Sequence, residues 1–281
     1  MGYVKFSMDS CFKQPLNEEL RVNSLHNFLN EGTRYFDFGG SCYHDRSIKS
    51  ILEMIPRISP NIETINFTRM RLNSDHKEMF ITLFKTCRNL KSLRVNCGVV
   101  NRCLIKELLI KDDFTLHDQD LQNALKKIDH LGCYMHKPKH GAQLLKLLPN
   151  LKSLEGTCFG PVLSDYVTTC APAGMALNIT KIMDIKTSYN TFENFFKFCP
   201  KLKSINLIHP GKKIIINLWK FPELVEINLS HFEIKELKNL LKICGHKITK
   251  LKLKNKDISK INKRSIKKLC PGLEKLKIEK I

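Results

Sequence analysis

The chain has 281 residues, 42% of them apolar, which is enough to build a continuous core and argues against global disorder. Its 47 basic and 27 acidic residues give a net charge of +20, which favours an anionic partner such as nucleic acid, an acidic protein or a membrane surface. No apolar run is long enough for a signal peptide or a membrane span. We therefore expect a cytoplasmic or nuclear protein that makes no use of a membrane.

One short pattern recurs along the chain after an N-terminal flank of residues 1–32. It consists of an apolar residue, two variable residues, a second apolar residue, one variable residue and a third apolar residue. The middle apolar position recurs at steps of 22 to 29 residues, with one step of 38, and predicts about ten repeats. In chain order the copies are Phe36-x-Phe38, Ile62-x-x-Ile65-x-Phe67, Leu90-x-x-Leu93-x-Val95, Ile128-x-x-Leu131-x-Cys133, Leu151-x-x-Leu154, Ile179-x-x-Ile182, Leu202-x-x-Ile205-x-Leu207, Leu224-x-x-Ile227-x-Leu229, Ile248-x-x-Leu251-x-Leu253 and Leu273-x-x-Leu276-x-Ile278.

Between these strands the apolar period changes from 2 to 3.6 residues, which predicts short helices with one buried stripe. Prolines then end the helices, because proline lacks an N–H and has a fixed φ. The apolar stripes are Ile48, Ile51, Leu52 and Ile55; Leu144, Leu145 and Leu148; Phe192, Phe195, Phe196 and Cys199; and Ile234, Leu237, Leu241 and Cys244. The prolines are Pro60, Pro149, Pro200, Pro222 and Pro271.

Strands stack about 4.8 Å apart, whereas helices need about 10 Å, so a row of strand-and-helix units must bend with its strands inside. The expected fold is therefore α/β: a curved parallel sheet on the concave side and short helices on the convex side. The repeats span residues 33–281, with insertions expected near 97–124 and 156–176.

The segments Cys199-Pro200-Lys201-Leu202-Lys203-Ser204-Ile205-Asn206-Leu207 and Cys270-Pro271-Gly272-Leu273-Glu274-Lys275-Leu276-Lys277-Ile278 carry a C-P-x-L-x-x-L-x-L pattern. This pattern resembles the signature of the cysteine-containing leucine-rich repeats, as in the repeat half of F-box proteins. The resemblance implies a leucine-rich-repeat solenoid that captures a protein target for a cullin-based ubiquitin ligase. No F-box is recognisable in residues 1–32, so a ligase adaptor is an expected partner only if an F-box lies outside this chain.

The eleven cysteines are an odd number and form no C-x-x-C pair, which argues against both a disulfide framework and a zinc module. Cys87, Cys199, Cys244 and Cys270 recur on the buried stripe one turn before a strand. There a small apolar side chain packs well. We expect reduced, buried thiols at these four positions.

Catalytic and metal-binding motifs are missing from the sequence. His136 and His140 have metal-ligand spacing, but Pro138 interrupts the segment and makes it a poor platform for zinc. No G-x-S-x-G, H-E-x-x-H or phosphate-cradling glycine-rich motif occurs. We expect no enzyme, no catalytic residue, no metal and no cofactor.

The variable strand positions should point into the concave face and carry the function, because the fold does not need their side chains. They are neutral and hydrogen-bonding at first, and become strongly basic toward the C-terminus, where residues 241–281 hold 14 basic against 3 acidic residues, a net +11. The predicted partner-binding residues are Thr64, Asn66, Ser92, Arg94, Asn96, Ser204, Asn206, Glu226, Asn228, Lys250, Lys252, Lys254, Lys275 and Lys277.

Two functions compete for this face. The first is binding of a protein target. The second is binding of an anion, either nucleic acid or an acidic protein, since lysines on neighbouring strands repel one another unless an anion lies over them. A simpler interpretation is that these lysines only keep the strand face soluble. Nucleic acid is the weaker partner, because the basic strands carry no aromatic platform for bases.

Overall fold

The structure is a computed structural model that describes residues 2–7, 24–39, 45–67, 76–96, 119–134, 145, 148–156, 176–185 and 189–281. The chain divides into two compact units, Met1–Leu151 and Lys152–Ile281. The predicted insertion near 156–176 lies almost wholly outside the described residues. So does the insertion near 97–124, except that its last part forms a helix.

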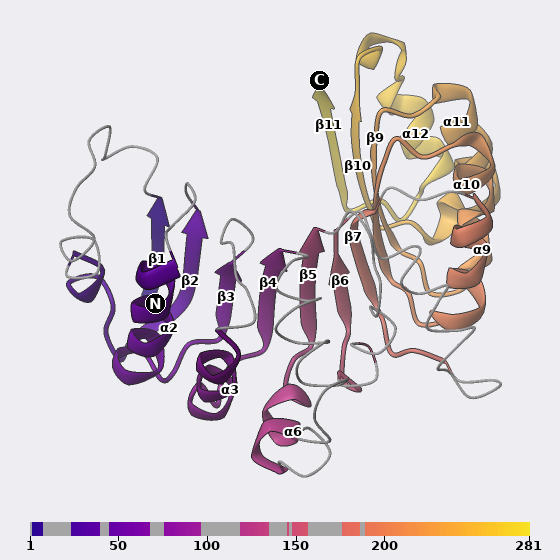
Figure 1. The fold of residues 1–281 in the computed structure, drawn as a ribbon. Helices are drawn as coiled ribbons and strands as arrows, with labels where there is room; N and C mark the ends of the chain where they lie inside the picture. Colours follow the sequence, from indigo (N-terminus) through magenta and orange to yellow (C-terminus); the bar gives the residue numbers. More distant parts are fainter. Residues whose placement is uncertain are drawn as a thin grey trace. The chain divides into compact units, whose positions relative to one another are not determined.

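The first unit is a parallel sheet whose strands are neighbours in chain order, with helices between them (Figure 1). Its strands are β1 (Gly2–Ser7), β2 (Thr33–Gly39), β3 (Thr64–Phe67), β4 (Ser92–Asn96) and β5 (His130–Tyr134). Its helices are α2 (Asp45–Ile58), α3 (Lys77–Thr86) and α6 (Gln119–Leu125).

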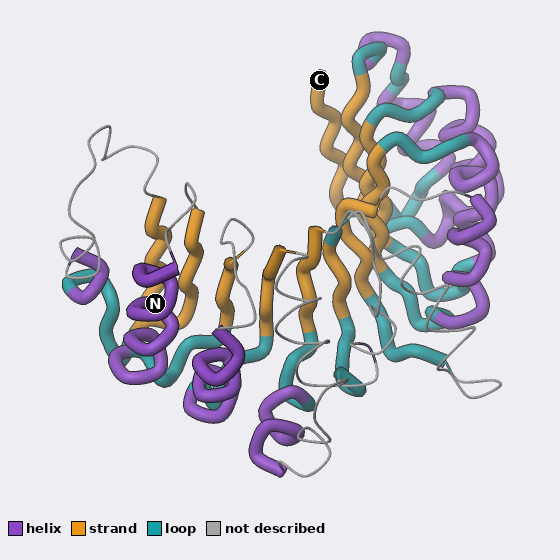
Figure 2. Tube along the Cα trace, in the orientation of Figure 1, coloured by secondary structure: helices purple, strands orange, loops and turns teal. Residues whose placement is uncertain are grey.

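The second unit repeats this arrangement with shorter connections (Figure 2). Its strands are β6 (Ser153–Glu155), β7 (Lys181–Ile185), β8 (Ser204–Ile208), β9 (Glu226–Ser230), β10 (Lys250–Asn255) and β11 (Lys275–Lys280). Its helices are α9 (Tyr189–Phe198), α10 (Lys212–Asn217), α11 (Ile234–Cys244) and α12 (Lys263–Leu269), with short 3-10 turns η4 (Leu218–Lys220), η5 (Gly245–Lys247) and η6 (Ile258–Lys260).

The middle apolar positions of the repeat stand next to one another on adjacent strands, so all ten predicted strands are confirmed. Within each unit these middle positions are register partners from strand to strand, and the shift between β7 and β8 begins only after Ile182. The column is Phe36, Ile65, Leu93 and Leu131 in the first unit and Leu154, Ile182, Ile205, Ile227, Leu251 and Leu276 in the second. All of these are buried except Leu276, which is half-buried on the last strand.

One strand was not predicted. The first strand was expected at Phe36-x-Phe38 after an N-terminal flank, but β1 lies within that flank and pairs in parallel with β2. The expectation was wrong because residues 2–7 alternate over too short a run to show the repeat pattern, and neighbouring β2 supplies the hydrogen-bonding partners that fix them as a strand.

The helices cover one face of the sheet in each unit. In the first unit Phe67 of β3 meets Phe80 of α3 edge-on, with ring centroids 5.9 Å apart. In the second unit Phe192 of α9 packs edge-on against Phe221, which follows the turn η4 in the next repeat, at 5.8 Å. The other face of each sheet carries the variable positions of the repeat, and we call it the strand face.

The four cysteines on the predicted buried stripe are indeed buried and reduced. Burial raises the pKa of the thiols of Cys87 and Cys199 to about 12, because a thiolate would lose its hydration there. It also raises the pKa of Cys244 to about 11, where Sγ donates to the carbonyl of Leu240 at 3.4 Å. The prediction of core packing at these four positions is therefore confirmed.

Candidate functional site: the strand face

The strand face of the first unit brings together four of its five predicted residues. Thr64 of β3 pairs in register with Ser92 of β4, and Asn66 pairs with Arg94. All four side chains are partly exposed. Asn96 ends strand β4, but its side chain lies outside the described residues.

An aspartate that the sequence did not single out orients one of these residues. Asp37 on β2 is in register with Asn66 on β3, and the Asn66 amide donates to its carboxylate at 2.9 Å. The same pairing recurs in the second unit, where Asn206 on β8 donates to Asp184 on β7 at 2.7 Å. An amide held by a carboxylate on the preceding strand is thus a feature of both units.

Asp184 has an unusual backbone conformation. Its φ is 56°, in the left-handed region that aspartate tolerates better than most residues. The register between β7 and β8 shifts at the same place, between Ile182 and Ile185. This irregularity aims the carboxylate at Asn206 and had no signal in the repeat pattern.

Arg94 reaches across the strand face toward β2, where its Nη1 lies 3.5 Å from the hydroxyl of Tyr35. On its other side, Gly132 of β5 is the register partner of Arg94. A Cβ at position 132 would lie only 2.7 Å from Cγ of Arg94. The absence of a side chain at Gly132 therefore makes room for the stem of Arg94.

The strand face of the second unit aligns the remaining predicted residues in rows that run across the strands. The first row is Ser204, Glu226, Lys250 and Lys275; the second is Asn206, Asn228, Lys252 and Lys277; the third is Ile208, Ser230, Lys254 and Glu279. The five predicted lysines thus lie side by side on β10 and β11.

Ser204 corrects the prediction in one respect. It was expected to contact a partner, but only 8% of it is exposed. Its register partners are Lys181 and Glu226, whose longer side chains flank the short serine on both sides. Ser204 therefore offers a partner little surface.

Glu279 changes the electrostatics of the lysine cluster. One of its carboxylate oxygens lies 3.1 Å from Nζ of Lys254 and 3.5 Å from Nζ of Lys252, and the other contacts Nζ of Lys277 in a short ion pair. These contacts hold the pKa of Glu279 at about 2, first through Lys277 and then through Lys254. A carboxylate of the chain itself thus lies against three of the five predicted lysines.

A shallow hollow of about 230 Å³ opens beside this cluster on the same face. Polar groups from four consecutive strands, β7 to β10, surround it, so the hollow is formed by several repeats together. Its polar lining comprises Asp184, Asn206, Asn228, Ser230, Lys252 and Lys254.

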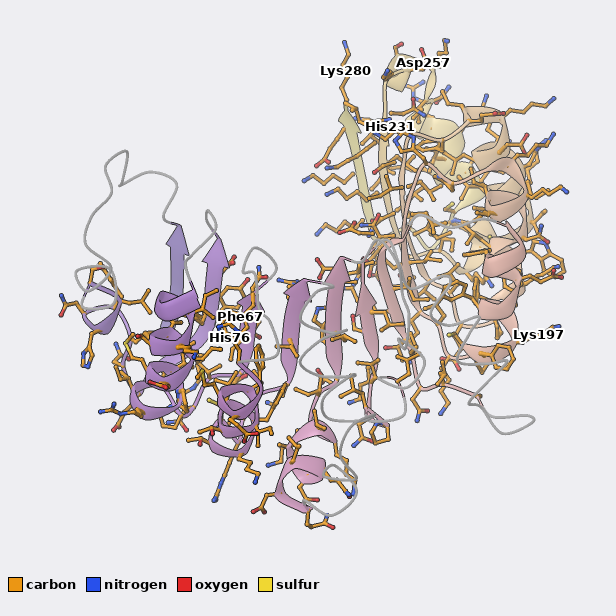
Figure 3. All side chains as sticks on the ribbon, viewed as in Figure 1. Phe67, His76, Lys197, His231, Asp257 and Lys280 are labelled. Carbon is orange, nitrogen blue, oxygen red and sulfur yellow. The ribbon has the colours of Figure 1, made fainter. Side chains whose placement is uncertain are left out.

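Two stacked histidines lie just beyond the ends of the strands that line the hollow. The rings of His209 and His231 are 4.0 Å apart and nearly parallel, at 14° (His231 is labelled in Figure 3). Both residues have left-handed backbones, with φ of 51° and 54°. Each backbone N–H donates to the next strand, His209 to Ser230 and His231 to Lys254. The pair thus ends β8 and β9 in the same way.

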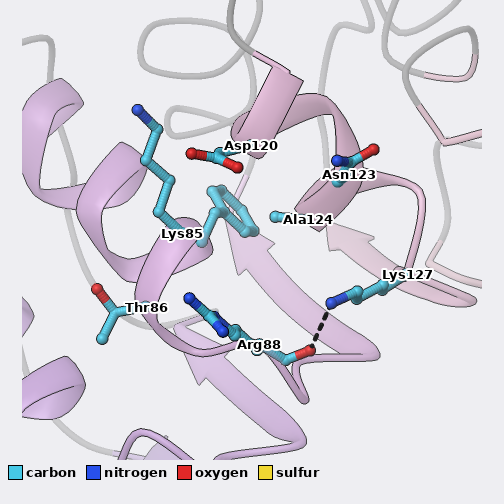
Figure 4. A pocket seen from close by; sticks show the side chains of 8 residues that line it. Lys85, Thr86, Arg88, Asp120, Asn123, Ala124 and Lys127 are labelled. Atoms are coloured by element: carbon cyan, nitrogen blue, oxygen red, sulfur yellow. Dashed lines mark hydrogen bonds between the residues drawn. The ribbon is translucent and has the colours of Figure 1, made fainter.

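A second hollow, of about 570 Å³, lies on the helix side of the first unit between α3 and α6 (Figure 4). Lys85, Arg88, Asp120 and Lys127 lie around it, and Lys127 Nζ donates to the carbonyl of Arg88 at 3.3 Å. That bond ties the turn after α6 to the turn after α3. The hollow has no counterpart among the residues predicted to bind a partner.

Within the described part of the chain, no group of three or more His, Cys, Asp and Glu side chains is placed to hold a metal ion. The pair His136 and His140 lies outside the described residues. No described helix is both long enough and apolar enough to cross a membrane.

The chain matches no protein-family model, and no curated protein matches it in sequence. In structure it is similar to the leucine-rich repeat-containing protein LegL7 from Legionella pneumophila, with a TM-score of 0.54 and 13% identity over 96% of this chain and 98% of that one. A weaker match is the chain of a TLR13–ssRNA13 complex, with a TM-score of 0.36 and 13% identity over 94% of this chain but only 38% of that one. Together with the repeats, the first likeness gives the fold: a leucine-rich-repeat solenoid.

Proposed function

We propose that this leucine-rich-repeat chain is a binding module without catalytic activity, and that it captures a protein on the strand face. The supporting observation is that the two faces of each sheet differ: one is covered by helices, and the other is polar. The helices and the apolar columns need only one face of each sheet, while the other holds polar side chains fixed in rows, such as Asn66 on Asp37 and Asn206 on Asp184. Prearranged polar groups lower the cost of binding.

Site-directed crosslinking tests this proposal. A photoreactive amino acid is placed in turn at Thr64, Ser92, Asn206 and Asn228 on the strand face. Controls carry it at Glu193 and Lys238, exposed positions on helices α9 and α11. We expect one and the same protein to be crosslinked in cell extract from several strand-face positions and from neither control. Equal recovery from helix positions would overturn the assignment of the face.

A finer proposal is that the module is the target-recognition half of a ubiquitin-ligase receptor, acting in the cytoplasm or the nucleus. It is supported by the C-P-x-L-x-x-L-x-L segments that begin at Cys199 and Cys270. The test is a pull-down from cells that express the full-length gene product, probed for the adaptor and the cullin. Absence of both from the full-length complex would remove ligase membership without affecting the binding face.

A second candidate function is anion binding by the lysines of β10 and β11, and the convergence of Lys252, Lys254 and Lys277 on one carboxylate favours it. Retention on heparin or RNA should then fall steeply between low and moderate salt. Replacing Lys250, Lys252 and Lys254 by glutamate should abolish that retention. Retention that does not change with salt would eliminate this function.

A further inference from the structure

We infer that the second unit binds an acidic, extended polypeptide along its strand face, and that Glu279 occupies one of the carboxylate positions of that partner while the face is empty. This inference rests on the proposed function and names the partner class.

The lysines are spaced for a strand-like ligand. Lys250, Lys252 and Lys254 alternate along β10, so their stems emerge from one face about 6.7 Å apart. Carboxylates at every second residue of an extended peptide have the same spacing. Lys275 and Lys277 repeat the arrangement on β11, in register with Lys250 and Lys252.

Glu279 shows that this face can hold a carboxylate. It reaches three ammonium groups on two strands while keeping only 26% of its side chain exposed. Lys252, Lys254 and Lys277 are more accessible than Glu279, with 38%, 42% and 55% of their side chains exposed. A partner carboxylate can therefore approach the same ammonium groups and compete with Glu279 for them.

The surroundings favour a polypeptide over a nucleic acid. The described strand-face side chains of β8–β11 are Ser, Asn, Ile, Glu and Lys, and none is an aromatic platform on which bases stack. Asn228 and Ser230 line the hollow next to the lysines, where they can hydrogen-bond a peptide main chain.

The probe is a fluorescein-labelled ten-residue peptide of alternating Glu and Ser, with fluorescence anisotropy as the readout on the full chain. Its controls are the same peptide with Gln for Glu, and a peptide of equal composition with its glutamates in one block. We expect binding of the alternating peptide, at least about tenfold weaker binding of the Gln peptide because charged partners are lost, and weaker binding of the block peptide. Equal affinity for the alternating and block peptides would overturn the strand-like geometry.

Two matched pairs of variants locate the site. The double variant K252E/K254E should weaken binding about tenfold or more. K238E/K263E makes the same change in net charge on exposed helix positions and should leave binding nearly unchanged. E279Q should bind more tightly, whereas E193Q, which removes one negative charge from α9, should not. Circular dichroism confirms that each variant is folded.

Four further outcomes would contradict parts of this inference. Equal losses in K252E/K254E and K238E/K263E would mean attraction to net charge, and would overturn the site. Unchanged affinity in E279Q would overturn the role of Glu279. Tighter binding of an oligouridylate of equal charge, with the same lysine dependence, would overturn the partner class in favour of RNA. If the peptide fails while strand-face positions still crosslink a protein, this inference fails and the proposed function stands.

Discussion

Lys254 and Glu279 are register partners on neighbouring strands, and Nζ of Lys254 lies 3.1 Å from the Glu279 carboxylate. The pKa of Glu279 is lowered from 4.5 to about 2, so the folded chain binds the proton less tightly than the unfolded chain. The contribution of Glu279 to stability is therefore present above about pH 4.5 and is lost as the pH falls toward 2.

Unfolding of the wild type and E279Q at several pH values tests this relationship. The wild type should be the more stable protein at pH 7, and the difference should shrink as the pH falls from about 4.5 to about 2. High salt should also reduce it, because the ion pairs are partly exposed. A constant difference across this pH range would mean that Glu279 acts through packing and not through its charge.

Truncating the middle apolar residue of a repeat should lower the free energy of unfolding by an amount that depends on how deeply that residue is buried. I205A removes a completely buried side chain and should cost about 2 to 5 kcal/mol of unfolding free energy. L276A changes the same repeat position on β11, where the side chain is only half-buried, and should cost less. Urea unfolding of both variants makes the comparison. A larger loss for L276A would contradict the burial seen on the last strand.

The buried thiols predict slow alkylation in the folded protein. Cys87 and Cys199 combine burial with a pKa of about 12, so almost no thiolate is present at pH 8. Iodoacetamide labelling followed by peptide mass spectrometry should leave both cysteines unmodified until denaturant is added. Rapid labelling of either one without denaturant would show that its repeat opens readily.

Glu236 is a buried carboxyl side chain on α11, whose other buried residues are leucines and a cysteine. Its side chain is 2% exposed and Oε1 lies 3.6 Å from Nζ of Lys212, while Oε2 has no hydrogen-bond partner among the described residues. K212M leaves the carboxylate buried alone and should destabilise the fold by about 1 to 3 kcal/mol.

The double variant K212M/E236M completes the test of this pair. It should recover the lost stability, because a methionine at position 236 leaves no buried carboxylate without a partner. The free energies of unfolding of the wild type, both single variants and the double variant form the cycle. A double variant less stable than K212M would mean that the carboxylate itself is needed.

The strands of the repeat could be predicted from the sequence because the repeat is a local pattern. Each apolar middle position, from Phe36 to Leu276, is buried or half-buried on a strand, as its own few neighbours in sequence indicate. The cysteines on the helix stripe could be assigned in the same way. Strand β1 could not, because pairing with β2 rather than its own pattern identifies it.

The candidate site depended on relationships between strands, and the repeat pattern does not contain them. The lysines of β10 and β11 could be placed on one face, but the role of Glu279 required the register that puts it beside Lys254. Asp37 and Asp184 were missed for the same reason, since each is defined by an asparagine on the next strand. The burial of Ser204 depends on its two neighbours across the sheet.

The chain-order pairing of the strands also bears on how the protein folds and yields under load. Among the described strand pairings, register partners lie close in sequence: Ser204 pairs with Glu226, 22 residues away, and the widest of these pairings, Ser92 with His130, spans 38 residues. Loops of this length cost less entropy to close than the longer loops of non-local pairings, so structure can nucleate in one repeat and spread to its neighbour. Under a pulling force the same chain should give way in successive steps, starting from repeats with half-buried residues such as Leu276.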